Sequence, residues 1–203
     1  MDDVERAVAA LERGGLIVYP TETLYGLGAD ATRAQAVERL ADLKERDREK
    51  PLSVLVASRA MLEEIVASIP PVAGRLMEAF WPGPLTIVLR AKDGLSARLT
   101  AGSGTIAVRL SSHPLAQAIV AALGRPLTAT SANPGGLPPA LDVAAARAYF
   151  GSRVDVYVDG GRSPAGPAST VVDCSATALR LVREGSVPLD RLEAAAGLRL
   201  QRE

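Results

Sequence analysis

Apolar residues recur along this chain at two different spacings, which together predict alternating helices and strands. Val4, Val8 and Leu11 lie three or four residues apart, as on one face of a helix, and Gly14 follows as a stop signal. Similar patterns predict helices over residues 3–13, 33–45, 58–68, 71–80, 114–123, 142–150 and 188–195. Short apolar runs predict strands over residues 16–19, 52–56, 85–90, 105–110, 127–130, 154–158, 170–174 and 179–182.

Several of the predicted strands follow one another without a helix between them. A pure series of strand, helix and parallel strand does not fit this order, whereas a mixed parallel and antiparallel sheet does. The sequence therefore predicts an α/β protein. Its 203 residues suit one domain, so we expect a single domain over residues 1–203.

The first predicted strand ends abruptly at Pro20. Hydroxyl groups, a carboxylate and two glycines follow within the next eight residues, in the order Thr21-Glu22-Thr23-Leu24-Tyr25-Gly26-Leu27-Gly28. Loops at strand ends are where α/β proteins place binding and catalytic groups. The alternative is a glycine-rich turn whose threonines cap the next helix, and the loop alone does not decide between the two.

Composition limits where binding can arise. Basic and acidic residues balance at 23 each, so any attraction for anions or RNA must come from a local cluster. Cys174 is the only cysteine and His113 the only histidine, which excludes an internal disulfide and a cysteine-based zinc site. Neither a secretion signal nor an apolar stretch of membrane-spanning length is present, so we expect a cytoplasmic protein without a membrane partner.

Residues 44–50 alternate in charge, with Lys44 and Lys50 at the ends of the run. Val37, Leu40 and Ala41 form an apolar stripe, and Lys44 continues it on the same helical face. We therefore expect Lys44 to point inward, where a polyphosphate would give its charge a partner. A lysine that merely extends past apolar surface, or a solvated helix end, would give the same pattern.

Polar residues also follow two later strands. Arg109 ends one strand, where its guanidinium suits a phosphate or carboxylate, although pairing with a neighbouring acid is equally expected. His113 precedes Pro114 at the start of a predicted helix, where a partly exposed helix cap is its simplest role. Ser131 and Asn133 offer a hydroxyl and an amide to a ligand, or build an ordinary turn.

Six motifs in order carry a family resemblance: PTET at 20–23, KERDREKP at 44–51, VR at 108–109 with His113, TSAN at 130–133, STVVD at 169–173 and VREG at 182–185. Over about residues 4–190 this set resembles the YrdC-type threonylcarbamoyl-AMP synthases. The resemblance implies a YrdC-like α/β fold: a twisted open mixed parallel/antiparallel sheet with flanking helices and a concave basic face.

The resemblance also implies roles for particular side chains. Two are implied to be catalytic, at the carbamate and the phosphates: Lys44 and Arg46. The implied ATP-binding residues are Arg46, Lys50, Arg109, Asn133 and Arg183. The implied L-threonine-binding residues are Thr23, His113, Ser131 and Ser169. No metal-ligating side chain is implied.

By the same resemblance, the implied reaction joins L-threonine, bicarbonate or CO2, and ATP, and releases pyrophosphate. Mg2+ is the implied cofactor, bound through the ATP phosphates. The product would supply threonylcarbamoyladenosine modification of tRNA through downstream threonylcarbamoyl-transfer proteins. Direct binding of tRNA or double-stranded RNA is a further partner that a basic concave face would allow.

Three other functions fit parts of the sequence. A serine hydrolase would use Ser131 and His113, but no G-x-S-x-G motif is present. A module that binds double-stranded RNA or tRNA without catalysis would also use a basic concavity. A carbamoyl-transfer domain of the hydrogenase-maturation type would share the fold, but the accessory regions of those proteins are missing.

The sequence departs from the family pattern after Asn133. Residues 134–141 read PGGLPPAL, without the hydroxyl that many relatives place near the nucleotide. This leaves one nucleotide contact unassigned. The chain continues for only 20 residues beyond Arg183, so we expect the short, single-domain form of the family.

Overall fold

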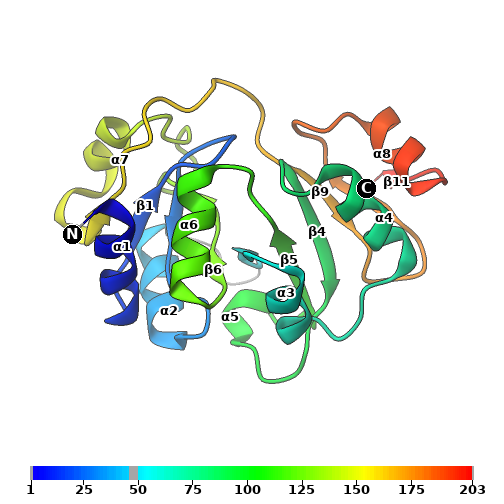
Figure 1. The fold of residues 1–203 in the computed structure, drawn as a ribbon, viewed down its shortest axis with the longest axis horizontal. Helices are drawn as coiled ribbons and strands as arrows, with labels where there is room; N and C mark the ends of the chain where they lie inside the picture. Colours follow the sequence, from blue (N-terminus) through cyan, green and yellow to red (C-terminus); the bar gives the residue numbers. More distant parts are fainter. Residues whose placement is uncertain (1, 46–49, 203) are drawn as a thin grey trace.

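The computed structural model describes residues 2–45 and 50–202, and its strands form two sheets (Figure 1). The four-stranded sheet has the order β7-β2-β1-β8 and consists of β1 (Ile17–Tyr19), β2 (Gly26–Gly28), β7 (Thr130–Ser131) and β8 (Val156–Tyr157). The seven-stranded sheet has the order β11-β10-β9-β4-β5-β3-β6 and consists of β3 (Ser53–Leu55), β4 (Leu85–Arg90), β5 (Thr105–Arg109), β6 (Leu127–Thr128), β9 (Thr170–Asp173), β10 (Arg180–Arg183) and β11 (Gln201–Arg202).

Both sheets mix parallel and antiparallel pairs. In the smaller sheet β1 is antiparallel to β2 and parallel to β8. In the larger sheet the central strand β4 is antiparallel to β5 and parallel to β9. The α/β class with mixed strand directions and flanking helices is therefore confirmed.

Eight α-helices lie among the described residues: α1 (Asp3–Glu12), α2 (Ala34–Leu43), α3 (Arg59–Ile65), α4 (Pro71–Phe80), α5 (Ala97–Thr100), α6 (Pro114–Leu123), α7 (Val143–Phe150) and α8 (Leu189–Ala196), with a short 3-10 turn at Gly151–Arg153. Helices α1 and α6 pack against each other beside the smaller sheet, and α4 packs against α8 beside β4 and β9 (Figure 1). After β8 the chain crosses from the region of the smaller sheet to β9 (Figure 1).

The segment predicted as one strand over residues 127–130 divides between the two sheets. Leu127 and Thr128 pair with β3, whereas Thr130 and Ser131 pair with β2. Ala129 lies between them, and its amide donates to the Ser53 carbonyl at 2.7 Å. One short segment thereby links the sheets and carries Ser131 to the edge of the smaller one.

Other differences from the prediction have local causes. The helix expected over 33–45 ends at Leu43, because Glu45 adopts a left-handed backbone with φ of 52°. Elements β2, α5 and β11 were not predicted, because their residues show no clear apolar periodicity. In β2, a Cβ atom at Gly26 would come within 2.8 Å of the Tyr19 ring, so glycine lets this ring lie across the strand.

Within the described ranges, no helix is long and apolar enough to cross a membrane.

Candidate active site

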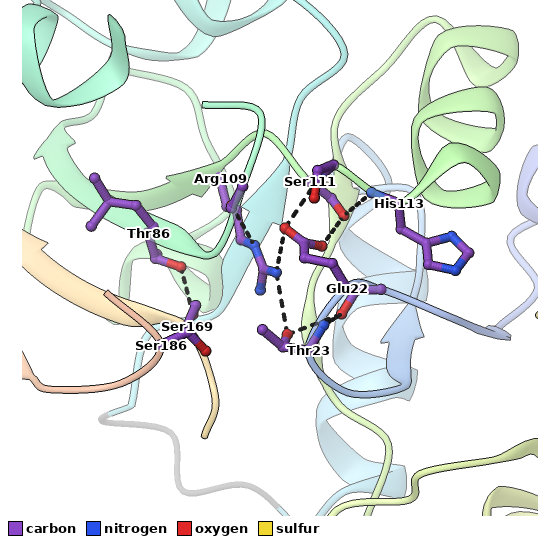
Figure 2. A network of polar contacts seen from close by, with 12 residues as sticks. Glu22, Thr23, Thr86, Arg109, Ser111, His113, Ser169 and Ser186 are labelled. Atoms are coloured by element: carbon purple, nitrogen blue, oxygen red, sulfur yellow. Dashed lines mark hydrogen bonds and ion pairs between the residues drawn. The ribbon is translucent and has the colours of Figure 1, made fainter. Parts of the chain in front are cut away.

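An ion pair joins the loop after β1 to the end of β5 (Figure 2). The Arg109 Nη2 atom lies 2.8 Å from Glu22 Oε1, with the two side chains only 9% and 18% exposed. Arg109 Nε also donates to the Gly83 carbonyl at 3.2 Å. The pairing of Arg109 with a neighbouring acid, one of the two expectations from sequence, is therefore present, and it fixes the guanidinium in one orientation.

Thr23 contacts the same guanidinium nitrogen as Glu22, since its Oγ1 accepts from Arg109 Nη2 at 3.2 Å. The same oxygen lies 3.1 Å from Thr21 Oγ1, which in turn donates to the Leu24 carbonyl at 2.6 Å. The loop is thus closed on itself by its own hydroxyls, in the way that threonine turns form. The outcome is a buried Thr23 hydroxyl held beside a cation.

Glu22 also holds the loop that follows β5. Its Oε2 accepts a short hydrogen bond from the Ser111 hydroxyl, and its Oε1 accepts from the Ser112 amide at 3.2 Å. Burial acts to raise the pKa of Glu22, but the Arg109 charge and these hydrogen bonds outweigh it, so the pKa lies below the ordinary value. Glu22 is therefore ionised at neutral pH.

His113 begins helix α6, and its Nδ1 accepts from the Leu115 amide at 3.3 Å. This is the partly exposed helix cap considered from the sequence. Partial burial lowers the pKa of His113, an effect that the nearby Glu22 charge opposes. The imidazole is therefore neutral at pH 7, beside the loop that Glu22 anchors.

A second group of hydroxyls and a cation comes from the larger sheet. Ser169 Oγ lies 2.9 Å from Thr86 Oγ1, and Arg183 Nη2 donates to the Ser169 carbonyl at 2.7 Å and to its hydroxyl at 3.2 Å. Arg183 is exposed at the end of β10, but partial desolvation of its guanidinium, followed by the positive charge of Arg109, lowers its pKa. Arg109 lies between this group and Glu22 (Figure 2). The guanidinium groups of Arg109 and Arg183 therefore lie close enough for their positive charges to influence each other.

Lys44 points inward, as its place on the apolar stripe predicted, and is 5% exposed. Its Nζ donates to the Ser131 carbonyl at 2.6 Å, the Asn133 carbonyl at 2.9 Å and Asn133 Oδ1 at 3.0 Å, with Ser131 Oγ at 3.3 Å. The Asn133 amide group donates to the Pro134 and Leu137 carbonyls. Lys44 therefore holds the turn at residues 131–133 together.

This turn lies beside the loop that carries Thr23. The Ala132 amide donates to the Tyr25 carbonyl at 2.8 Å, and Ser131 pairs with Gly26. The structure therefore brings Thr23, Arg109, His113, Ser169 and Arg183 together in one polar region, with Lys44, Ser131 and Asn133 on its border. Lys50 is exposed at the start of the next segment, and Arg46 lies outside the described residues.

Three polar residues of this region were not singled out from the sequence: Glu22, Thr86 and Ser111. Glu22 carried a signal, because it stands between two threonines in the loop after the first strand. Thr86 is an alternating position of an ordinary strand, and Ser111 is one of two adjacent serines. Nothing in their local sequence indicates that they lie next to a distant carboxylate or hydroxyl.

Two cavities lie elsewhere. Their volumes are about 410 and 270 Å³, and both are lined by Ser68 in the middle of the segment between α3 and α4. The larger is also lined by Arg90 and Cys174. Burial raises the pKa of the Cys174 thiol to about 12, so this cysteine is unreactive at neutral pH. Neither cavity is lined by residues of the polar region.

Comparison with protein families gives a match over residues 9–185 to the Sua5/YciO/YrdC model, which carries the description "Telomere recombination". The chain belongs to the Sua5/YciO/YrdC family. The match includes every residue of the polar region described above. The expected family is therefore confirmed.

Curated relatives carry the name threonylcarbamoyl-AMP synthase. The Bacillus subtilis protein is 38% identical over 195 residues, which are 96% of this chain and 56% of that protein. The Halorhodospira halophila protein is 41% identical over 157 residues, which are 77% of this chain and 82% of that protein. The chain thus spans little more than half of some curated relatives and most of others.

Solved structures agree with the fold. Pyrococcus abyssi Sua5 complexed with L-threonine superposes with a TM-score of 0.95 at 34% identity, covering 98% of this chain and 58% of that one. Escherichia coli YciO superposes with a TM-score of 0.84 at 29% identity, covering 93% and 92%. A full-length HypF structure, at 20% identity, shares the fold alone.

Proposed function

We propose that this protein makes L-threonylcarbamoyl-AMP from L-threonine, bicarbonate or CO2, and ATP, with release of pyrophosphate. The observation that carries the proposal is the polar region itself. It joins two guanidinium groups, Arg109 and Arg183, to the hydroxyls of Thr23 and Ser169 in a chain of this family. Curated relatives named for this activity, and a relative complexed with L-threonine, support it.

In the proposed reaction the amine of threonine attacks the carbon of CO2 and loses a proton, forming a carbamate. A carbamate oxygen then attacks the α-phosphorus of ATP, and the bond to the bridging oxygen breaks, so that pyrophosphate leaves with the electron pair. Both steps place negative charge beside the protein. Fixed cations and hydroxyl donors would stabilise this charge without reorganising.

We assign the residues as follows. Thr23, His113, Ser131 and Ser169 would contact threonine, and Arg109, Asn133 and Arg183 would face the nucleotide. Lys44 would meet the carbamate and the phosphates by exchanging some of its present oxygen partners. Arg46 and Lys50 are assigned to ATP from their sequence positions alone.

We propose that Mg2+ arrives with ATP, bound to its phosphate oxygens, and neutralises part of their charge. The Glu22 carboxylate is a poor metal ligand, because both its oxygens already accept from protein groups. The proposed product would pass to the proteins that modify tRNA.

The test supplies purified protein with ATP, MgCl2, bicarbonate and L-threonine. We expect pyrophosphate release that depends on threonine, and one carbon from labelled bicarbonate in each AMP adduct. Lys44→Ala should lower the rate about a hundredfold or more, as for loss of a preorganised charge. Lys92→Ala is the matched control, because Lys92 is an exposed lysine bonded to the Glu63 carbonyl and lines the smaller cavity. Threonine-independent release, or none, would contradict the proposal.

A further inference from the structure

Glu22 occupies an unexpected position for a carboxylate. The substrates of the proposed reaction are anions or carry carboxylates, so a negative charge in this region opposes their binding unless it is neutralised. Glu22 nevertheless lies 2.8 Å from Arg109, at the centre of the network (Figure 2). Its presence calls for a role that outweighs this repulsion.

The contacts of Glu22 indicate what it does. One carboxylate receives the Arg109 guanidinium, the Ser111 hydroxyl and the Ser112 amide. The Ser111 hydroxyl in turn accepts from the His113 amide at 3.2 Å. Glu22 therefore joins three parts of the chain: the loop after β1, the end of β5 and the start of α6.

These contacts argue against a role for Glu22 as a general base. A base needs an oxygen within reach of the proton that it removes, whereas both oxygens here are already bonded to protein donors. The Arg109 charge also stabilises the ionised carboxylate, which weakens its basicity. The contacts of Glu22 therefore fit a role in binding and orienting the neighbouring protein groups.

We propose that Glu22 is a positioning residue that holds the Arg109 guanidinium and the 111–113 loop in register with each other. Arg109 is assigned to the nucleotide, and Thr23 and His113 are assigned to threonine. Glu22 thereby fixes the distance between the two substrates' binding groups, while its own charge is neutralised by Arg109. This inference rests on the proposed function for its kinetic consequences, but its structural half stands alone.

The kinetic test is a double-mutant cycle of Glu22→Ala and Arg109→Ala. We expect Glu22→Ala to lower kcat/KM about a hundredfold, the cost typical of a misplaced binding group, with KM raised for both threonine and ATP. Because Glu22 and Arg109 hold each other in place, the double variant should lose less than the sum of the two single losses, expressed as free energies. Glu22→Gln keeps an acceptor for Arg109 and should recover most of the lost activity.

Additive losses in the cycle, or equal losses for Glu22→Gln and Glu22→Ala, would overturn the proposal. If Glu22→Ala does not fold, the cycle is run with Glu22→Gln, for which smaller, non-additive losses are expected. Hydrogen–deuterium exchange without substrate provides a separate readout. We expect faster exchange over residues 111–115 in Glu22→Ala, and unchanged exchange there would also overturn it.

The two proposals fail in distinguishable ways. Wild-type protein that releases no pyrophosphate with threonine contradicts the proposed function and leaves the exchange measurement to decide on Glu22. Active wild-type protein with additive losses contradicts only the role of Glu22.

Discussion

Arg109 and Arg183 meet the same polar region but are held in different ways. Arg109 is buried and pairs with a carboxylate, a hydroxyl and a carbonyl. Arg183 is exposed at the end of β10 and bonds only to the carbonyl and hydroxyl of Ser169 among the described residues. Glu22 balances the charge of Arg109 and fixes its orientation. Arg183 lies at the surface and has no carboxylate partner among the described residues.

This difference separates two tasks. The Glu22–Arg109 pair contributes little net charge, so its value lies in fixed geometry and in connecting three segments. Arg183 attracts anions through its charge, and within the described residues it is hydrogen-bonded only to Ser169. Removal of the first should therefore disturb both folding and binding, whereas removal of the second should disturb binding alone.

The largest effect is expected from Arg109→Ala. This change leaves the mostly buried Glu22 carboxylate without its cation, so the free energy of unfolding should fall by about 3 kcal/mol, the low end for a broken buried pair. Urea denaturation followed by circular dichroism measures it. A loss below about 1 kcal/mol would show that the Glu22–Arg109 pair contributes no more than a surface ion pair. Arg109 and Arg183 would then not differ in their contribution to stability.

Arg183→Ala should lower kcat/KM for ATP by about tenfold to a hundredfold, through loss of one charge-assisted contact in the transition state. The unfolding midpoint should stay close to that of the wild type, because no carboxylate depends on Arg183 in the part of the chain described.

Arg180→Ala is the matched control, since Arg180 lies on the same strand but pairs with Asp173 at 3.0 Å. If both arginine variants affect ATP use equally, the charge at position 183 has no special role.

Acid should weaken the protein partly through Glu22. The pKa of Glu22 is lower in the folded chain than its ordinary value of 4.5, so the unfolded chain binds this proton more tightly. The stabilisation by Glu22 is therefore complete above that value and is lost as the pH falls below it. Unfolding free energies measured between pH 3 and 6 should decline less steeply for Glu22→Gln; equal slopes would contradict an ionised, paired Glu22.

Ser169→Ala should have only a small effect on stability. It removes the hydroxyl that contacts Thr86 and Arg183 but keeps the carbonyl that accepts from Arg183 at 2.7 Å. We expect a loss of about 1 kcal/mol, typical of one hydrogen bond, and a raised KM for threonine with that for ATP little changed. A larger rise for ATP would place the Ser169 hydroxyl with the nucleotide.

The sequence predicted most helices and strands to within about two residues, because their apolar periods are regular. It also predicted the inward direction of Lys44 from the stripe formed by Val37, Leu40 and Ala41. It did not predict that residues 127–130 divide between two sheets, because a local pattern carries no information about the pairing partner.

The same limit applies to the candidate site. The sequence left two partners open for the Arg109 guanidinium, a bound ligand or an acidic side chain. The structure shows an acidic partner, Glu22, which lies 87 positions earlier. A contact over that separation is created by the fold and has no local signature. The roles of the site residues toward ATP and threonine stay predictions.

The interleaved strand order has a consequence for how this protein folds. Strand β1 pairs with β8 across more than 130 residues, and β4 pairs with β9 across more than 80. Pairings between such distant segments slow folding, because a long loop must close before they form. The polar region draws on residues from Thr21 to Arg183. During synthesis it can therefore assemble only after about nine-tenths of the chain has left the ribosome.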